Sequence, residues 1–152
     1  MYNHTQIGWL MLVSLGAAVL FTGYFGIVSS NWIALCVFGV LVVCIILFPS
    51  LTVTGDDNLI EVRFGPGLIR KKFLLEDIES CRPVKNQWWY GWGIRKIPRG
   101  WLFNVSGLDA VELLMKNGRV YRIGTDEPQT LNEFIQRRLN EGKKSVGQGD
   151  SL

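Results

Sequence analysis

Few residues of this chain have the types and spacing that catalysis requires. The single histidine, His4, stands ahead of a long apolar stretch, where we expect it to be solvated rather than a base or a ligand. Ser106 has no histidine partner in the polar half of the chain, which excludes a serine triad. Glu76, Asp77 and Glu79 lie close together, but in a strand Asp77 and Glu79 share a face that is ordinarily solvated. The sequence therefore predicts no enzyme activity, no metal site and no cofactor.

Aromatic and basic residues gather instead in the run WWYGWGIRKIPRGW, residues 88–101, which holds four of the six tryptophans. Between Ser80 and Leu108 there are five basic residues and no acidic one, a local charge of +5 against +3 for the whole chain. Tryptophan favours the headgroup level of a bilayer, and each Lys or Arg near anionic lipid contributes about 1 kcal/mol. We expect lipid or partner contact through Trp88, Trp89, Tyr90, Trp92, Arg95, Lys96, Arg99 and Trp101.

Other interpretations of this run stay open. Its tryptophans could fill a small core, with its glycines marking a tight bend or bulge and its bases coating the rim. Arg95 could pair internally with Asp109 or Glu112. The run could also form a groove for a protein or peptide. Nucleic acid would use the same residue types, but a membrane tether argues against it, and no small-molecule substrate is indicated.

The elements that position this run begin with an apolar stretch. Residues 1–50 contain no Asp, Glu, Lys or Arg, so all sixteen basic and all thirteen acidic residues follow Ser50. A charge buried in hydrocarbon costs about 2.5 to 3.5 kcal/mol on insertion scales. A charge-free stretch of this length therefore predicts a membrane segment followed by a polar domain.

The membrane segment is predicted to cross twice, over residues 7–29 and 32–48, each close to the roughly 17 to 25 residues that a span needs. The polar break between them is so short that the helices must be antiparallel neighbours. Trp9 and Trp32 fall near helix ends, at the expected water interface. Small residues in the first span permit close packing against the second span or against another copy of the chain.

Basic residues predict the orientation. None precedes the first span and none lies in the hairpin loop, whereas Arg63, Arg70, Lys71 and Lys72 follow the second span. Both termini are therefore expected in the cytoplasm, with the chain integral to the cytoplasmic (inner) membrane. A secretory signal is disfavoured, because the first apolar run has no basic region before it and is too long. The three cysteines have no paired spacing, which argues against a disulfide framework or a zinc site.

The polar domain is expected to be mostly strands, because apolar and polar residues alternate. Asn117-Gly118 predicts a two-residue type I′ hairpin. After Thr125-Asp126-Glu127-Pro128 the period becomes helical, with Leu131, Phe134, Ile135 and Leu139 on one face. Residues 141–152 lack apolar periodicity and predict a disordered tail. The strands expected are 51–54, 60–64, 68–74, 78–84, 101–105, 110–115 and 120–123.

The order of these elements carries a resemblance, together with the runs YGWGIR (90–95), GWLFNVSG (100–107), AVEL (110–113) and NGRVYRIGTDEP (117–128). The chain resembles small bacterial two-span membrane proteins with a pleckstrin-homology-like (PH-like) domain. The resemblance covers about residues 50–140. It implies an α+β fold: a transmembrane helical hairpin over residues 1–50, then a seven-stranded antiparallel bent β-barrel capped by a C-terminal helix over 51–140.

These features together predict a membrane-anchored, non-enzymatic binding or scaffolding module at the cytoplasmic face of the membrane. Its aromatic and basic run would contact anionic lipid. The alternative is a subunit of a larger membrane complex, which would meet a protein partner through the barrel edge or through the same run. A homo-oligomer formed through the transmembrane hairpin is a further possible assembly.

Overall fold

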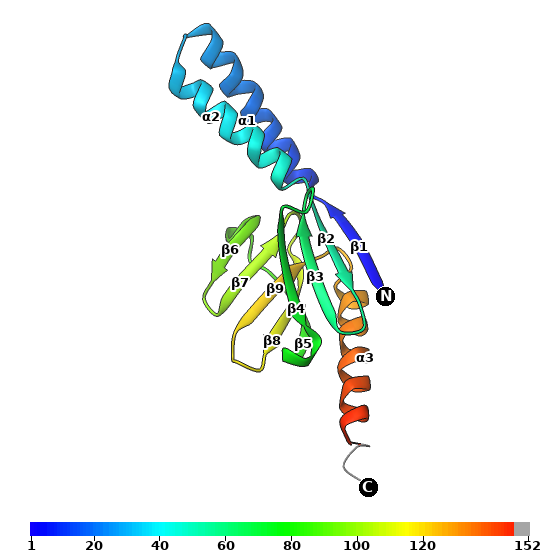
Figure 1. Ribbon diagram of the computed structural model, residues 1–152. Helices are drawn as coiled ribbons and strands as arrows, with labels where there is room; N and C mark the ends of the chain where they lie inside the picture. The colour runs from blue at the N-terminus through cyan, green and yellow to red at the C-terminus, as the bar shows by residue number, and fades with distance from the viewer. Residues whose placement is uncertain (148–152) are drawn as a thin grey trace.

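A computed structural model describes residues 1–147, with side chains described only as far as residue 142, and its fold is α+β as predicted. A pair of helices projects from a domain of two sheets, and a third helix lies along that domain (Figure 1). The elements in chain order are β1 (Tyr2–Ile7), α1 (Trp9–Val28), α2 (Trp32–Leu47), β2 (Ser50–Gly55), β3 (Leu59–Phe64), β4 (Ile69–Leu74), the 3-10 turn η1 (Leu75–Asp77), β5 (Ile78–Lys85), the 3-10 turn η2 (Trp88–Tyr90), β6 (Gly93–Ile97), β7 (Gly100–Asn104), β8 (Asp109–Met115), β9 (Val120–Gly124) and α3 (Pro128–Gly147).

The helices α1 and α2 lie side by side and antiparallel (Figure 1). The Asn31 side chain caps α2 by accepting hydrogen bonds from the backbone N–H groups of Ile33 and Ala34. Among residues 1–147, α1 is the one helix long and apolar enough by itself to cross a membrane. The shorter α2 has 16 residues. Ile7, the predicted first residue of the first span, instead ends a strand.

The first sheet is an antiparallel meander in the order β1-β2-β3-β4. The second sheet has the order β5-β8-β9-β7-β6. An entirely antiparallel domain was expected, but β7 pairs with β9 in parallel. The described strands number nine rather than seven, because β1 and β6 were not expected. Gly100 permits the parallel pair, since a Cβ there would overlap the Val120 carbonyl oxygen.

Aromatic rings join the two sheets at the core. Phe73 of the first sheet lies 4.9 Å from Tyr121 and 6.2 Å from Phe103 of the second, measured between ring centroids. The alternation that predicted β2 and β3 is confirmed, because every second side chain in these strands is buried. Helix α3 packs on β5 and β8. Its Leu131 and Ile135 are fully buried, as the helical period predicted.

The turn between β8 and β9 lies where the sequence placed it, but its type differs. Gly118 has a positive φ of 79°, whereas Asn117 does not share that conformation. The Gly118 N–H donates to the Met115 carbonyl at 2.9 Å, and the Arg119 N–H donates to the Asn117 side chain. This geometry is that of a type I turn followed by a glycine bulge. The type I′ prediction was wrong because only one residue adopts the left-handed conformation.

Helix α3 begins at Pro128, behind Thr125, whose hydroxyl accepts a hydrogen bond from the Glu127 N–H. The helix continues to Gly147, so the tail predicted from residue 141 begins as helix. Residues 148–152, the rest of that predicted tail, lie outside the described part of the chain.

The helical pair is inserted between two neighbouring strands. β1 pairs with β2 from Tyr2 opposite Gly55 to Ile7 opposite Ser50. At the Ile7–Ser50 end of this pair the chain leaves the sheet into α1 and returns to it from α2. The Gly8 N–H donates to the Pro49 carbonyl at 3.0 Å across the two connections. Little free chain therefore separates the helices from the sheet, which fixes the helical pair to the domain.

Candidate functional site

The aromatic and basic run starts at the end of the domain next to the helical pair, and β6 leads the rest of it away from that end (Figure 1). β2 runs away from the helical pair, and each following strand reverses direction, so β5 returns toward it (Figure 1). The turn η2 and the start of β6 follow β5 directly. The predicted run is therefore a turn and a β-hairpin, β6–β7, rather than one long loop.

Two tryptophans of η2 are highly exposed. Trp88 keeps 74% of its surface accessible and Trp89 keeps 61%, and their rings meet edge to face at 5.8 Å. Tyr90 extends this chain of rings, at 6.3 Å from Trp89. Trp101 on β7 is 44% exposed, whereas Trp92 is partly buried. Trp88 and Trp89 therefore do not fill the core, which was one interpretation of the run.

The three bases of the run are exposed. Arg95 Nε donates to the Trp92 carbonyl at 3.2 Å, which folds the guanidinium over the η2–β6 bend. No ion pair involves Arg95, Lys96 or Arg99 among the side chains that the structure describes. Lys96 lies opposite Trp101 in the β6–β7 ladder. The run thus offers positive charge that is not neutralised by the described part of the domain.

Glu112, one partner considered for Arg95, is engaged elsewhere. Arg82 donates to its Oε1 at 2.6 Å and 2.9 Å, and Arg122 donates to its Oε2 at 2.8 Å. Burial alone would raise the pKa of Glu112, but the hydrogen bonds from the two arginines outweigh it and lower that pKa. Glu112 therefore stabilises the second sheet and leaves Arg95 without this partner.

A hollow of about 550 Å³ separates the start of β6 from the base of the helical pair. Met11 and Leu15 of α1 and Cys44 of α2 contribute to one wall, and Trp92, Arg95 and Lys96 contribute to the other. The sequence placed the last three residues in the site. It missed the helical wall, because no local pattern indicates which turns of a helix will face a strand 80 residues later.

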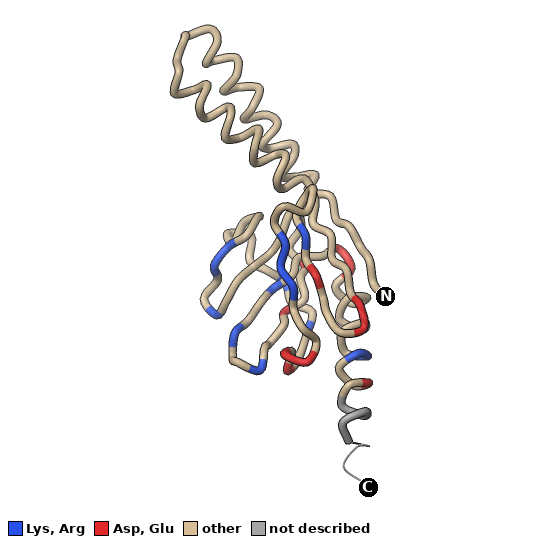
Figure 2. Tube along the Cα trace, viewed as in Figure 1, with Lys and Arg blue, Asp and Glu red and all other residues tan. Residues whose placement is uncertain are grey.

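Charge is distributed unevenly over the molecule. Figure 2 shows a helical pair without Lys, Arg, Asp or Glu, basic residues along β4 and β6 and at the β8–β9 turn, and acidic residues on β3, ahead of α3 and at two turns far from the helical pair. Those turns carry Asp56 and Asp57 between β2 and β3, and Glu76 and Asp77 in η1. The acidic cluster at η1 thus lies away from the aromatic and basic run.

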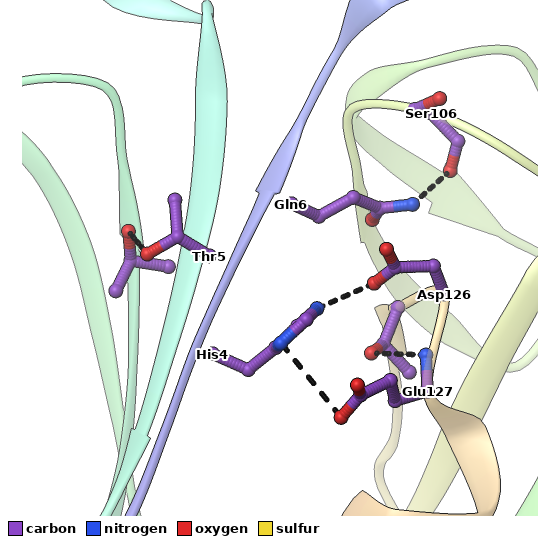
Figure 3. A network of polar contacts seen from close by, with 8 residues as sticks. His4, Thr5, Gln6, Ser106, Asp126 and Glu127 are labelled. Atoms are coloured by element: carbon purple, nitrogen blue, oxygen red, sulfur yellow. Dashed lines mark hydrogen bonds and ion pairs between the residues drawn. The ribbon is translucent and has the colours of Figure 1, made fainter.

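His4 was predicted to be solvated, but the structure places it in contact with two carboxylates. Its Nε2 lies 2.5 Å from Asp126 Oδ1, and its Nδ1 lies 3.7 Å from Glu127 Oε2 (Figure 3). The neighbouring Gln6 donates from Nε2 to the Ser106 carbonyl at 3.2 Å. These contacts fasten β1 to the start of α3 and to the β7–β8 connection. The sequence feature that could have indicated strand β1 is the alternation of Tyr2, His4 and Gln6. These three side chains point inward, and two of them are polar.

The cysteines and acidic residues do not assemble a reactive centre in the described part of the chain. Cys81 is buried, and burial raises the pKa of its thiol to about 11, which keeps the thiol protonated at neutral pH. In residues 1–142, no group of three or more His, Cys, Asp or Glu side chains is placed to hold a metal ion. The exposed chemistry of this end is therefore aromatic and basic.

The chain was compared with protein families, with curated proteins and with solved structures, and no match was found in any of the three.

Proposed function

We propose that this protein is a membrane-anchored, non-enzymatic binding or scaffolding module whose aromatic and basic run contacts anionic lipid at the cytoplasmic face of the bacterial inner membrane. The helices α1 and α2 act as a two-span anchor. The run 88–101 holds the domain against the leaflet, with Trp88 and Trp89 among the headgroups and Arg95 and Lys96 facing lipid phosphates.

The observation that carries this proposal is the shared hollow. Arg95 and Lys96 border the same space as Met11 and Leu15, residues near the start of α1. If α1 spans the bilayer, its first turns lie at the water interface, and the start of β6 lies at that level too. Exposed tryptophans and unneutralised bases at this level suit a headgroup layer better than bulk water.

Helix lengths fit the proposed anchor with one adjustment. At 1.5 Å per residue, the 20 residues of α1 extend about 30 Å, the thickness of a hydrocarbon core. The 16 residues of α2 extend only about 24 Å. Local thinning of the bilayer accommodates a shorter helix at modest cost. The β1–β2 pairing supports the arrangement, because both ends of the hairpin must reach the same sheet.

The PH-like assignment of the domain is also part of the proposal. A four-stranded meander, a second sheet packed on it and a helix at the C-terminal end support it. Two features depart from the expected pattern: the parallel β7–β9 pair and the additional strands β1 and β6. The proposed membrane contact depends on the position of the aromatic and basic run, so it does not require the domain to be PH-like.

The test uses the full chain with Trp9 and Trp32 replaced by Phe, so that the remaining tryptophans all lie in the domain. Reconstituted in anionic vesicles whose acyl chains carry bromine, this protein should show quenched tryptophan fluorescence. Adding Trp88→Phe and Trp89→Phe should remove most of the quenching, whereas Trp101→Phe alone should leave most of it. Equal fluorescence in brominated and ordinary lipid would refute membrane contact by this run.

A second candidate function is that of a subunit in a larger membrane complex. It is favoured by β6, one of the two edge strands of the second sheet, whose outer edge could accept a strand from a partner. Photo-crosslinking from positions 88 and 96 in intact membranes distinguishes the two functions. Crosslinking to a single protein would favour a subunit of a membrane complex. Crosslinking to lipid would favour contact of the run with the membrane leaflet.

A further inference from the structure

The hollow between β6 and the helical pair has walls of opposite chemistry. The helical wall includes Met11, Leu15 and Cys44, from helices that contain no charged residue. The facing wall includes Trp92, Arg95 and Lys96. The hollow is a wide, open depression of about 550 Å³ rather than an enclosed cavity. An occupant that joins an apolar part to an anionic part would match both of its walls.

The basic wall has donors available for an anion. Arg95 uses Nε for the Trp92 carbonyl, and in the described part of the chain no hydrogen bond or ion pair uses its two terminal nitrogens. No acidic residue occurs between Ser80 and Leu108 to compete for it. The indole N–H of Trp92, another residue of this wall, is buried without an acceptor, which is unfavourable for a polar group.

The depth of the hollow selects between anions. Leu15 lies six residues after Trp9, the first residue of α1, which is about 9 Å along the helix axis. The polar layer on each side of a bilayer is about 5 to 8 Å thick. If α1 enters the hydrocarbon core near Trp9, the helical wall extends from the water interface into hydrocarbon, so a free phosphate would leave its inner part unfilled.

We propose that this hollow binds one anionic phospholipid per chain, with its phosphate at the terminal nitrogens of Arg95, the Lys96 ammonium nearby, and an acyl chain along the helical wall. This proposal rests on the proposed function and goes further. The proposed function needs only general attraction to a charged leaflet, whereas this site would hold one specific lipid molecule. A zwitterionic lipid fits less well, since its cationic group would lie near the two bases. The bound lipid would join the domain to its anchor on the side opposite β1.

The experiment is native mass spectrometry of the full chain in neutral detergent. We expect one phosphatidylglycerol to be retained per chain, and phosphatidylcholine with the same acyl chains to be retained far less. The double variant Arg95→Gln, Lys96→Gln removes two charge-assisted contacts and should weaken retention about tenfold or more. The matched control is Lys116→Gln, Arg119→Gln, which removes the same charge at the exposed β8–β9 turn.

A second variant tests the apolar wall without changing charge. Cys44→Phe fills part of the hollow and should also weaken phosphatidylglycerol retention, while circular dichroism verifies that the fold is kept. Three results would each overturn the single-lipid site. The first is equal retention of phosphatidylglycerol and phosphatidylcholine, and the second is an equal loss of phosphatidylglycerol retention in the two double variants. The third is retention of inorganic phosphate to the same extent as phosphatidylglycerol. Fluorescence quenching by brominated vesicles would survive that result, whereas its absence would refute the proposed function itself.

Discussion

Glu112 is the carboxylate on which two arginines of the second sheet converge, and its side chain is only 11% exposed. Glu112→Gln would leave Arg122, 21% exposed, without its charged partner. We expect this substitution to lower the free energy of unfolding by about 2 to 3 kcal/mol, less than for a fully buried pair because Arg82 is mostly exposed. Chemical denaturation in detergent measures it. The exposed Glu79→Gln serves as control and should change stability by less than about 0.5 kcal/mol.

The contribution of Glu112 should depend on pH in a defined direction. Its folded-state pKa lies below the ordinary value of 4.5, so the stabilisation is complete above that value. It is lost as the pH falls through the lower folded-state pKa, where the carboxylate is protonated in both states. The stability difference between wild type and Glu112→Gln should therefore narrow only as the pH falls below 4.5. A constant difference would contradict the ionised pairing.

Single residues differ in how far sequence reveals their roles. Exposed aromatic and basic side chains in one short run are visible as composition, so Trp88, Trp89 and Arg95 could be found. His4 could not, because its partners Asp126 and Glu127 lie 122 and 123 residues away and only pairing of β1 with β2 brings them together. Met11 and Leu15 were missed for the same reason, since their place beside β6 is set by tertiary structure.

At the scale of elements, β1 is an unexpected member of the domain. Tyr2 is buried and its ring lies 5.6 Å from that of Phe134 on α3. Tyr2→Ala should lower the free energy of unfolding by about 3 kcal/mol, in the range for loss of a buried aromatic ring. Asn3→Ala is the matched control, because Asn3 is exposed in the same strand. Equal stability of both variants would show that β1 is not part of the folded domain.

Elements with strong local signals were predicted well. β2 and β3 alternate cleanly, and α3 has a proline start and a regular apolar face. β1 was missed because two of its three inward residues are polar, and β6 because its strand follows a bend rich in glycine and tryptophan. The parallel β7–β9 pair depends on long-range contacts that no short window of sequence contains.

At the scale of the whole molecule, the proposed anchor makes a simple prediction. Val40 lies near the middle of α2 and is 62% exposed. Val40→Arg places a charge at the bilayer centre at a cost of about 2.5 to 3.5 kcal/mol, so much of the variant should leave the membrane fraction. Carbonate extraction followed by ultracentrifugation measures this. Val40→Leu is the control, and unchanged membrane retention of the arginine variant would contradict a bilayer position for α2.

Polarity along the chain revealed the division between apolar helices and charged domain, because the boundary near residue 50 is abrupt. The way the two parts join was not predictable. The sequence was equally compatible with a flexible linker between the helices and the domain. The structure instead has a close junction, formed by the Gly8–Pro49 hydrogen bond and by the rings of Phe48 and Phe64, whose centroids are 5.4 Å apart.

The position of β1 has a consequence for biogenesis. The ribosome makes Tyr2–Ile7 before either apolar helix, yet its partner β2 emerges only after both. Until then the six residues have no strand to pair with, and under the proposed anchoring they must stay on the side of the membrane where β2 will emerge. A nascent chain that exported them would never complete its first sheet, so successful folding of the domain would act as quality control on insertion of the hairpin.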